Sequence, residues 1–196
     1  MRIFSLLLML VLVGAGCSTP VSDVPSAQPA STTETAAETQ TTNILTYAMS
    51  SGIVLFTAPE NWFVRQADAG GGSVITIQAT KDDEEGMDIL VANPWSTDGV
   101  EVTYEQWLAK YSFTESLGSR EIGGYTFSEY DIQVNGKSLT AYTAVIDEVR
   151  PLYIKIQVRT ESPEITDVLS SLAFFPSEEV QSSAQPIPEW QLSDRE

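Results

Sequence analysis

Strict alternation of apolar and polar residues constrains the fold of this sequence more than any other feature. In Leu152–Val158 every second residue is apolar, and Lys155 and Gln157 lie between the apolar positions. A period of two predicts a β-strand with one buried face and one polar face. The same reasoning predicts further strands at 73–80, 87–92, 125–134 and 139–146. A shift in the phase of the alternation near Ser128 predicts a β-bulge.

Short connections between these stretches indicate that neighbouring strands are antiparallel. Asn135-Gly136 separates two predicted strands and is a strong signal for a tight hairpin turn. Residues 147–151 form another short link. Near the start, Ser50–Gly52 separates Ile44–Ala48 from Ile53–Ala58 and predicts one more hairpin.

Two stretches have the apolar spacing of a helix. The first contains Tyr104, Trp107, Leu108 and Tyr111, and Thr103 with Gln106 fits a capping box before it. The second is predicted at Pro163–Phe174, with Ser162 as N-cap and Pro163 in the first helical position. The order of elements predicts an α+β fold in which helices pack on an antiparallel sheet of about six strands.

The N-terminus has the pattern of a bacterial export signal. Arg2 and the apolar run Ile3–Val13 precede the small residues Gly14–Gly16 and then Cys17. This arrangement resembles the lipobox of bacterial lipoproteins, although Gly14 stands where a branched residue is commoner. The resemblance implies a signal peptide at 1–16 and a diacylglyceryl thioether on Cys17. The alternative is an ordinary secreted protein whose single cysteine is there by chance.

Polar segments flank the predicted domain on both sides. Residues 18–42 contain no Leu, Ile, Phe, Tyr or Trp, so we expect 17–42 to be a lipidated cysteine followed by a disordered linker. A flexible chain of this length spans about 25–30 Å. The folded domain is expected at 43–176. Residues 177–196 are expected to be a flexible acidic tail, with Trp190 as its one aromatic residue.

Charge and composition exclude several classes of function. The net charge of −17 opposes binding to nucleic acid and to anionic lipid headgroups. The absence of histidine excludes Ser-His-Asp and Cys-His catalysis and the usual zinc sites that contain histidine. A single cysteine permits no internal disulfide.

Three segments resemble the PsbP-like family. They are VLFTAPENW with Pro59 and Trp62, TYEQWLAKY at 103–111, and YIKIQVRTESPEITDVLSSLAFF at 153–175, so the resemblance covers about residues 43–176. It implies an α/β/α sandwich on an antiparallel sheet, ending in a short strand at the aromatic pair Phe174 and Phe175. Family members range from photosystem II subunits to small bacterial lipoproteins, and no functional residue of the family transfers to a position here.

Two groups of residues are candidate sites. Pro59 and Trp62 are expected either to line a cleft for a ligand or partner, or to form a rigid turn with a core anchor. Five carboxylates between two predicted strands could supply oxygen ligands to calcium, but they lack the spacing of a calcium loop and also suit a solvated loop: Asp82, Asp83, Glu84, Glu85 and Asp88.

The sequence therefore predicts a non-catalytic accessory or binding module of the bacterial cell envelope. Lipid on Cys17 would hold it at the membrane, facing the periplasm or the cell exterior, beside an envelope protein complex. We expect a monomer with no cofactor and no nucleic acid partner. The alternatives are a lipoprotein that binds a small ligand or a divalent cation such as calcium, and a carboxylate-based hydrolase with two acids facing each other across a cleft.

Overall fold

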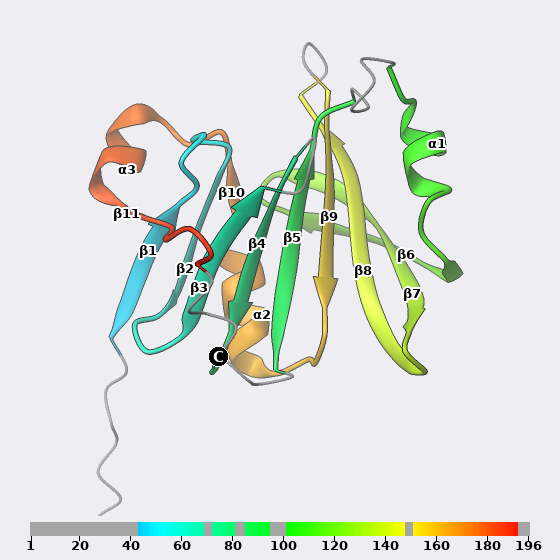
Figure 1. Cartoon of the computed structure of the whole chain (residues 1–196), viewed down its shortest axis with the longest axis horizontal. Coiled ribbons are helices and arrows are strands. Elements are labelled where there is room, and N and C mark those ends of the chain that lie inside the picture. Colours follow the sequence, from blue (N-terminus) through cyan, green and yellow to red (C-terminus); the bar gives the residue numbers. More distant parts are fainter. Residues whose placement is uncertain (1–42, 69–71, 81–84, 95–100, 148–150, 192–196) are drawn as a thin grey trace, which may run out of the picture. The chain divides into compact units, whose positions relative to one another are not determined.

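The computed structural model describes residues 43–68, 72–80, 85–94, 101–147 and 151–191. All of them belong to the compact unit Gln40–Glu196 (Figure 1). The strands of this part of the chain are β1 Ile44–Ala48, β2 Val54–Pro59, β3 Phe63–Asp68, β4 Gly72–Gln78, β5 Gly86–Ala92, β6 Phe113–Ile122, β7 Tyr125–Val134, β8 Lys137–Ile146, β9 Leu152–Val158, β10 Ala173–Phe174 and β11 Gln185–Pro186. Its helices are α1 Tyr104–Leu108, α2 Pro163–Ser171 and α3 Glu178–Ser183. None of these helices is both long enough and apolar enough to cross a bilayer.

The strands form two sheets. The larger sheet has seven strands in the order β3-β4-β5-β9-β8-β7-β6, and all of its pairings are antiparallel. The smaller sheet has the order β10-β2-β1-β11, and its strand β11 runs parallel to β1. The predicted antiparallel sheet is confirmed, with seven strands in place of about six. Strands β3 and β6 were not predicted, and the two strands predicted near the start of the domain, β1 and β2, belong to the smaller sheet.

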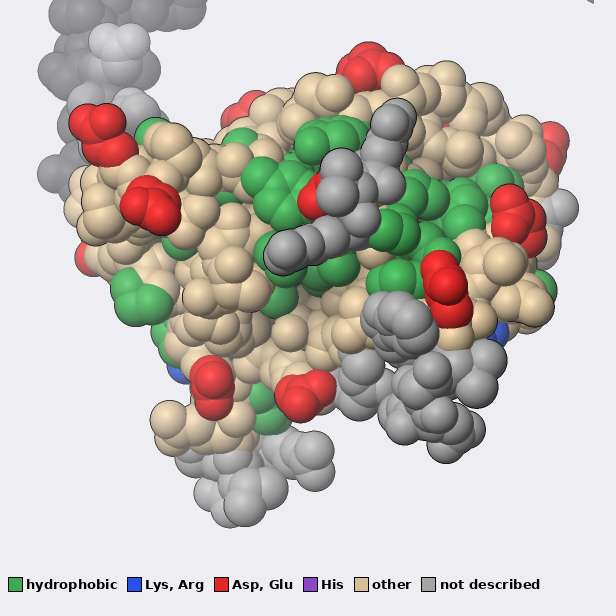
Figure 2. Space-filling view, turned by 90° about the horizontal axis from the view of Figure 1, so that it is seen from above, with side chains coloured by type: hydrophobic (Ala, Val, Ile, Leu, Met, Phe, Trp, Pro, Cys, Tyr) green, Lys and Arg blue, Asp and Glu red, His purple; other side chains and the backbone are tan. Residues whose placement is uncertain are grey.

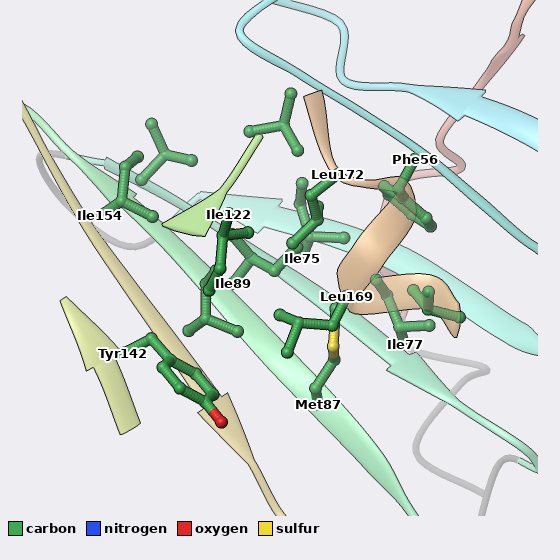
Figure 3. Close-up of a cluster of buried hydrophobic side chains, with 14 of the residues drawn as sticks. Phe56, Ile75, Ile77, Met87, Ile89, Ile122, Tyr142, Ile154, Leu169 and Leu172 are labelled. Atoms are coloured by element: carbon green, nitrogen blue, oxygen red, sulfur yellow. The ribbon is translucent and has the colours of Figure 1, made fainter. Parts of the chain in front are cut away.

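The main core lies on one face of the larger sheet. Ile154, Ile156 and Val158 of β9 point into it, and Ile165 and Leu169 of α2 pack against the same cluster. Figure 3 shows side chains of the sheet meeting those of α2 and β2 in this core. The alternation read from the sequence therefore identified the buried face correctly.

The opposite face of the larger sheet carries a second, smaller cluster. Tyr153 packs there against Trp107 of α1 and Ala92 of β5. A helix thus lies on each face of the sheet, which supports the sandwich in coarse outline. The layer over the main core is not helical throughout, because α2 shares it with strands of the smaller sheet.

The Asn135-Gly136 hairpin is confirmed. Both residues have positive φ values, 53° and 79°, as a type I′ turn requires. Val134 and Lys137 pair directly across the turn, so β7 and β8 stay in one continuous register.

The bulge predicted near Ser128 is wrong. Residues 128–134 of β7 pair with β8 without interruption. The irregularities lie instead in β6, between Phe113 and Glu115 and between Ser116 and Gly118. The apolar phase of β7 changes because its first half contributes Phe127 to the main core, while Tyr130, farther along, stacks on Phe113 on the other face.

The predicted caps of the two helices are confirmed. The Thr103 hydroxyl accepts from the Gln106 N–H, and the Gln106 side chain accepts from the Thr103 N–H at 2.9 Å. The Ser162 hydroxyl accepts from the Ile165 N–H at 3.2 Å, with Pro163 at the start of α2. The predicted end of α2 at Phe174 is wrong, because Ala173–Phe174 leave the helix to pair with β2.

We expect Ser162→Ala to lower the free energy of unfolding by about 1 kcal/mol, because the Ile165 N–H loses its cap. Ser170→Ala is the matched control in the same helix, since the Ser170 hydroxyl only donates to the Thr166 carbonyl on an exposed face. The control should stay within about 0.5 kcal/mol of the original protein. Urea unfolding of both variants measures the difference, and equal losses would contradict the assigned cap.

The C-terminal segment corrects the prediction of a flexible tail from residue 177. We call residues 177–191 the C-terminal strap. It contains α3 and β11, and its Ile187 is 3% exposed in the main core. Its backbone also pairs with β3: the Gln66 N–H donates to the Pro188 carbonyl at 2.9 Å, and the Trp190 N–H donates to the Gln66 carbonyl at 2.7 Å. The strap packs because Ile187 and Trp190 provide apolar anchors. Most of its other residues are polar, and for that reason the sequence predicted a flexible tail.

Candidate functional site

Several predicted residues lie outside the described part of the chain. Cys17, the signal peptide and the linker belong to residues 1–42, and Asp82, Asp83 and Glu84 belong to residues 81–84. Their predicted roles stay predictions.

Asp88, the last of the five predicted calcium ligands, already has protein partners. Its carboxylate accepts a hydrogen bond from the Thr76 hydroxyl at 2.9 Å and lies 3.7 Å from the Arg159 guanidinium. Arg159 in turn donates to the Gln78 side chain at 2.8 Å. Within the described residues no three acidic side chains are grouped so that they could hold a metal ion.

Pro59 and Trp62 form a tight turn between β2 and β3. The Trp62 N–H donates to the Pro59 carbonyl at 3.0 Å, and the half-buried Trp62 ring packs against the main core. The turn is also tied to the start of the domain, because the Glu60 N–H donates to the Asn43 carbonyl at 2.9 Å and the Asn43 side chain donates to the Glu60 carboxylate at 3.0 Å. The turn is therefore rigid and anchored to the core.

The same two residues also line an open cavity of about 320 Å³, which we call the turn cavity. Its other lining residues are Ile44, Thr57, Ala58, Asn61, Glu164, Asp167 and Val168. Pro59 and Trp62 thus form a turn that packs on the core, and both also line this cavity. That the cavity receives a ligand or a partner stays a prediction.

The turn cavity combines an apolar floor with acidic groups. Ile44 is 60% exposed at its rim, and Trp62 and Val168 provide further apolar surface. Glu164 and Asp167 come from one turn of α2, and the described residues that line this cavity include neither Lys nor Arg. Such a surface suits an apolar side chain that is followed by a basic one.

A second cavity, of about 560 Å³, lies between β3 and the C-terminal strap, and we call it the strap cavity. It is lined by Ser50, Gln66, Ala67, Asp68, Gly72, Ser73, Asn93, Glu189 and Trp190. The sequence did not predict it. No local pattern indicated it, because the polar Gln66 interrupts the apolar alternation that would have identified the inward face of β3.

Aromatic residues gather on the face of the larger sheet that carries α1. The rings of Tyr104, Trp107 and Tyr153 lie 5.4–5.8 Å apart, and the Lys155 ammonium lies 4.1 Å from the centre of the Tyr111 ring. Burial lowers the pKa of Lys155, while the nearby Asp88 carboxylate opposes that change.

The tyrosine hydroxyls of this cluster have partners within the protein. Tyr104 donates to the Thr143 hydroxyl at 2.8 Å, and Tyr153 donates to the Val102 carbonyl at 2.7 Å. Burial raises the pKa of both tyrosines. We therefore interpret the cluster as the packing that holds α1 on the sheet.

Comparison with known proteins gives similarity to solved structures alone. No family model matches the chain, and no curated protein matches it. Among solved structures, the chain is similar to the solution structure of cyanobacterial PsbP (CyanoP) from Synechocystis sp. PCC 6803, with a TM-score of 0.43 and 9% sequence identity. The match covers 70% of this chain and 95% of that chain.

Proposed function

We propose that this chain is a lipid-anchored, non-catalytic binding module of the bacterial cell envelope. Cys17 carries the lipid, the linker lets the domain reach away from the membrane, and the turn cavity binds a membrane-associated protein. The observation that carries the proposal is this open cavity, where a rigid Pro59–Trp62 turn meets the acidic first turns of α2.

The chemistry of the turn cavity indicates the kind of partner. Its apolar floor favours an Ile, Leu or aromatic side chain, and Glu164 and Asp167 favour an adjacent Lys or Arg. The chain as a whole has a net charge of −17, and Figure 2 shows acidic side chains spread over one face of the domain. A basic partner would be attracted over a longer range for the same reason.

The position of the cavity fits a partner close to the membrane. Ile44 lines the cavity and is the second described residue of the domain, so the linker joins the domain at the cavity rim. A disordered linker over 17–42 would place the cavity within about 25–30 Å of the lipid anchor on average.

The arrangement of the acids supports a binding role over hydrolysis. Carboxylate-pair hydrolysis requires two acids on opposite sides of the bond that is cleaved. Glu164 and Asp167 instead project from one turn of one helix.

Photo-crosslinking in intact cells tests the proposed docking site. We expect a photoreactive side chain at Ile44 to give one recurrent adduct with a membrane-associated protein. The same group at Leu117, which is 50% exposed on β6, should not give this adduct. Glu164→Lys should reduce the Ile44 adduct about tenfold, because it places a like charge against the basic partner.

Glu178→Lys is the matched control for Glu164→Lys. Both residues are exposed acids in the first turn of a helix, and Glu178 does not line the turn cavity. The adduct should persist in this control. Equal adducts from Ile44 and Leu117, or equal losses in the two Lys variants, would overturn the proposed docking site.

The second candidate function is a lipoprotein that binds a small ligand or a divalent cation. The strap cavity favours it, because its volume of about 560 Å³ lies in the range typical of small-molecule sites.

A further inference from the structure

The C-terminal strap is joined to the rest of the domain by a strained residue. Phe175 has a φ of 51°, in the left-handed region that bulky side chains rarely adopt. Pro176 follows it, and a residue before proline favours an extended backbone. The folded chain therefore holds Phe175 in a conformation that its own side chain and its neighbour both disfavour.

This strained residue separates two sets of contacts. Before it, Ala173 and Phe174 pair with β2, and the Phe175 N–H donates to the Ile53 carbonyl at 2.9 Å. Rotation about the φ and ψ angles of Phe175 leaves these bonds in place and moves the residues that follow. Phe175 therefore has the position of a hinge, and the strap is the segment that the hinge moves.

The strap packs against one stretch of the chain, residues 47–66. Strand β11 pairs with Tyr47 and Ala48, and the Ile187 N–H donates to the Ala48 carbonyl at 3.1 Å. Farther along, the strap pairs with Gln66 of β3. The hinge is the only covalent link between the strap and the domain, because a single cysteine permits no disulfide within the chain. The same stretch on a second copy of the chain can therefore receive the strap.

The sequence of the strap keeps it extended when it leaves this surface. Pro186 and Pro188 flank Ile187, have no N–H and have φ angles fixed at about −65°. Prolines at such spacing favour an extended backbone without internal hydrogen bonds. A strap that is already extended loses less conformational freedom when it binds to a second copy.

We propose that two copies of this chain exchange their C-terminal straps. In the exchanged dimer the strap of each copy pairs with β1 and β3 of the other, and Ile187 enters the main core of the other copy. The contacts of the strap are remade, while Phe175 returns to an extended conformation. Exchange of an identical element is a low-cost route to a dimer, and a strained hinge favours it.

The exchange leaves the turn cavity unchanged. The described residues that line this cavity lie before the hinge, between Ile44 and Val168. The exchanged dimer therefore has two turn cavities, and the proposal stands whether or not a protein docks at them.

Photo-crosslinking between two differently tagged copies in the same cells tests the exchange. One copy carries a photoreactive side chain in place of Ser182, and the other copy carries none. Ser182 of the strap and Ser50 of the β1–β2 turn line the same small cavity. We expect an adduct that contains both tags and joins position 182 to the turn at Ser50. The same group at Leu117, on an edge strand of the larger sheet, measures chance encounters and should give no such adduct.

Two substitutions at the hinge distinguish release of strain from loss of the ring. Phe175→Gly and Phe175→Ala both remove an aromatic side chain that is 41% exposed. Glycine adopts a positive φ freely, so the closed form of that variant has no strain to release, whereas alanine keeps the strain. We expect Phe175→Gly to reduce the two-tag adduct at least about tenfold and Phe175→Ala to leave it within about twofold.

Four results would overturn the proposal. The first is a crosslink within one copy, which shows that the group at position 182 reacts, without any adduct that contains both tags. The second is an equal yield of two-tag adducts from positions 182 and 117. The third is an equal loss in the two hinge variants, which would assign the effect to the Phe175 ring. The fourth is an adduct between position 182 and a different protein, which would assign the surface under the strap to that protein.

Discussion

The Cys17→Ala variant is expected to lose all fatty-acid label when cells are grown with a tagged fatty acid. Only the Cys17 thiol can form the thioether, because the chain has a single cysteine. Each CH₂ of an acyl chain buried in the bilayer contributes about 0.8 kcal/mol, so two chains hold the protein firmly. Mass spectrometry of the N-terminal peptide should find lipid on Cys17 in the original protein and no residues from 1–16.

Ser18→Ala is the control for this experiment, since it changes the neighbouring residue and leaves the thiol intact. It should keep the label and the processed N-terminus. Label that persists in Cys17→Ala, or an unmodified Cys17 in the original protein, would exclude the lipid anchor and leave an ordinary secreted protein.

Phe56→Ala is expected to lower the free energy of unfolding by about 3–5 kcal/mol. Phe56 is 0% exposed, and its ring stacks on Tyr47 with centroids 5.6 Å apart. Figure 3 shows it beside α2, where β2 meets the main core. The substitution removes an aromatic ring from a place that the surrounding helix and strands cannot close.

Phe175→Ala is the matched control, because it removes the same ring from a site that is 41% exposed. It should cost about 1 kcal/mol or less. Thermal unfolding of both variants measures the difference, and we expect Phe56→Ala to lower Tm by on the order of 10 °C. Similar losses for the two variants would mean that β2 does not close the main core.

Strands with one buried face could be predicted from the sequence because their alternation is itself the result of burial. In β9, Ile154 and Ile156 are fully buried and Lys155 is not, so the apolar alternation in the sequence agrees with the burial in the structure. The same holds for the caps, since Thr103 and Ser162 act through bonds to residues only three positions away. Features that depend on residues close together in the chain could therefore be predicted from the sequence.

Strands β3 and β6 could not be predicted in this way. Strand β6 lies at an edge of the larger sheet, and its residues 115–119 are all exposed, so it has no apolar alternation to read. In β3 the inward position next to Val64 is Gln66, a polar residue buried by the C-terminal strap.

The candidate sites differ in the same way: some residues belong to a local sequence pattern, and others meet only through the tertiary fold. Pro59 and Trp62 could be predicted because a Pro-x-x-Trp turn is a local feature. Their cavity partners Glu164 and Asp167 could not, because α2 reaches them only through the tertiary fold. The strap cavity depends on contacts between residues 66 and 188–190, and no local pattern records these contacts.

The pairing of β11 with β1 has a consequence for where this domain ends. Strand β1 would otherwise leave its backbone groups open along one side of the smaller sheet, and such an edge is a template for aggregation. Tyr47 and Ala48 are covered there by Gln185 and Pro186, and Pro186 has no N–H with which to recruit another strand. A chain cut after Phe175, where the apolar pattern stops, would expose the edge of β1. It would also remove Ile187 from the main core. The smallest unit in which this edge is covered therefore extends through the C-terminal strap.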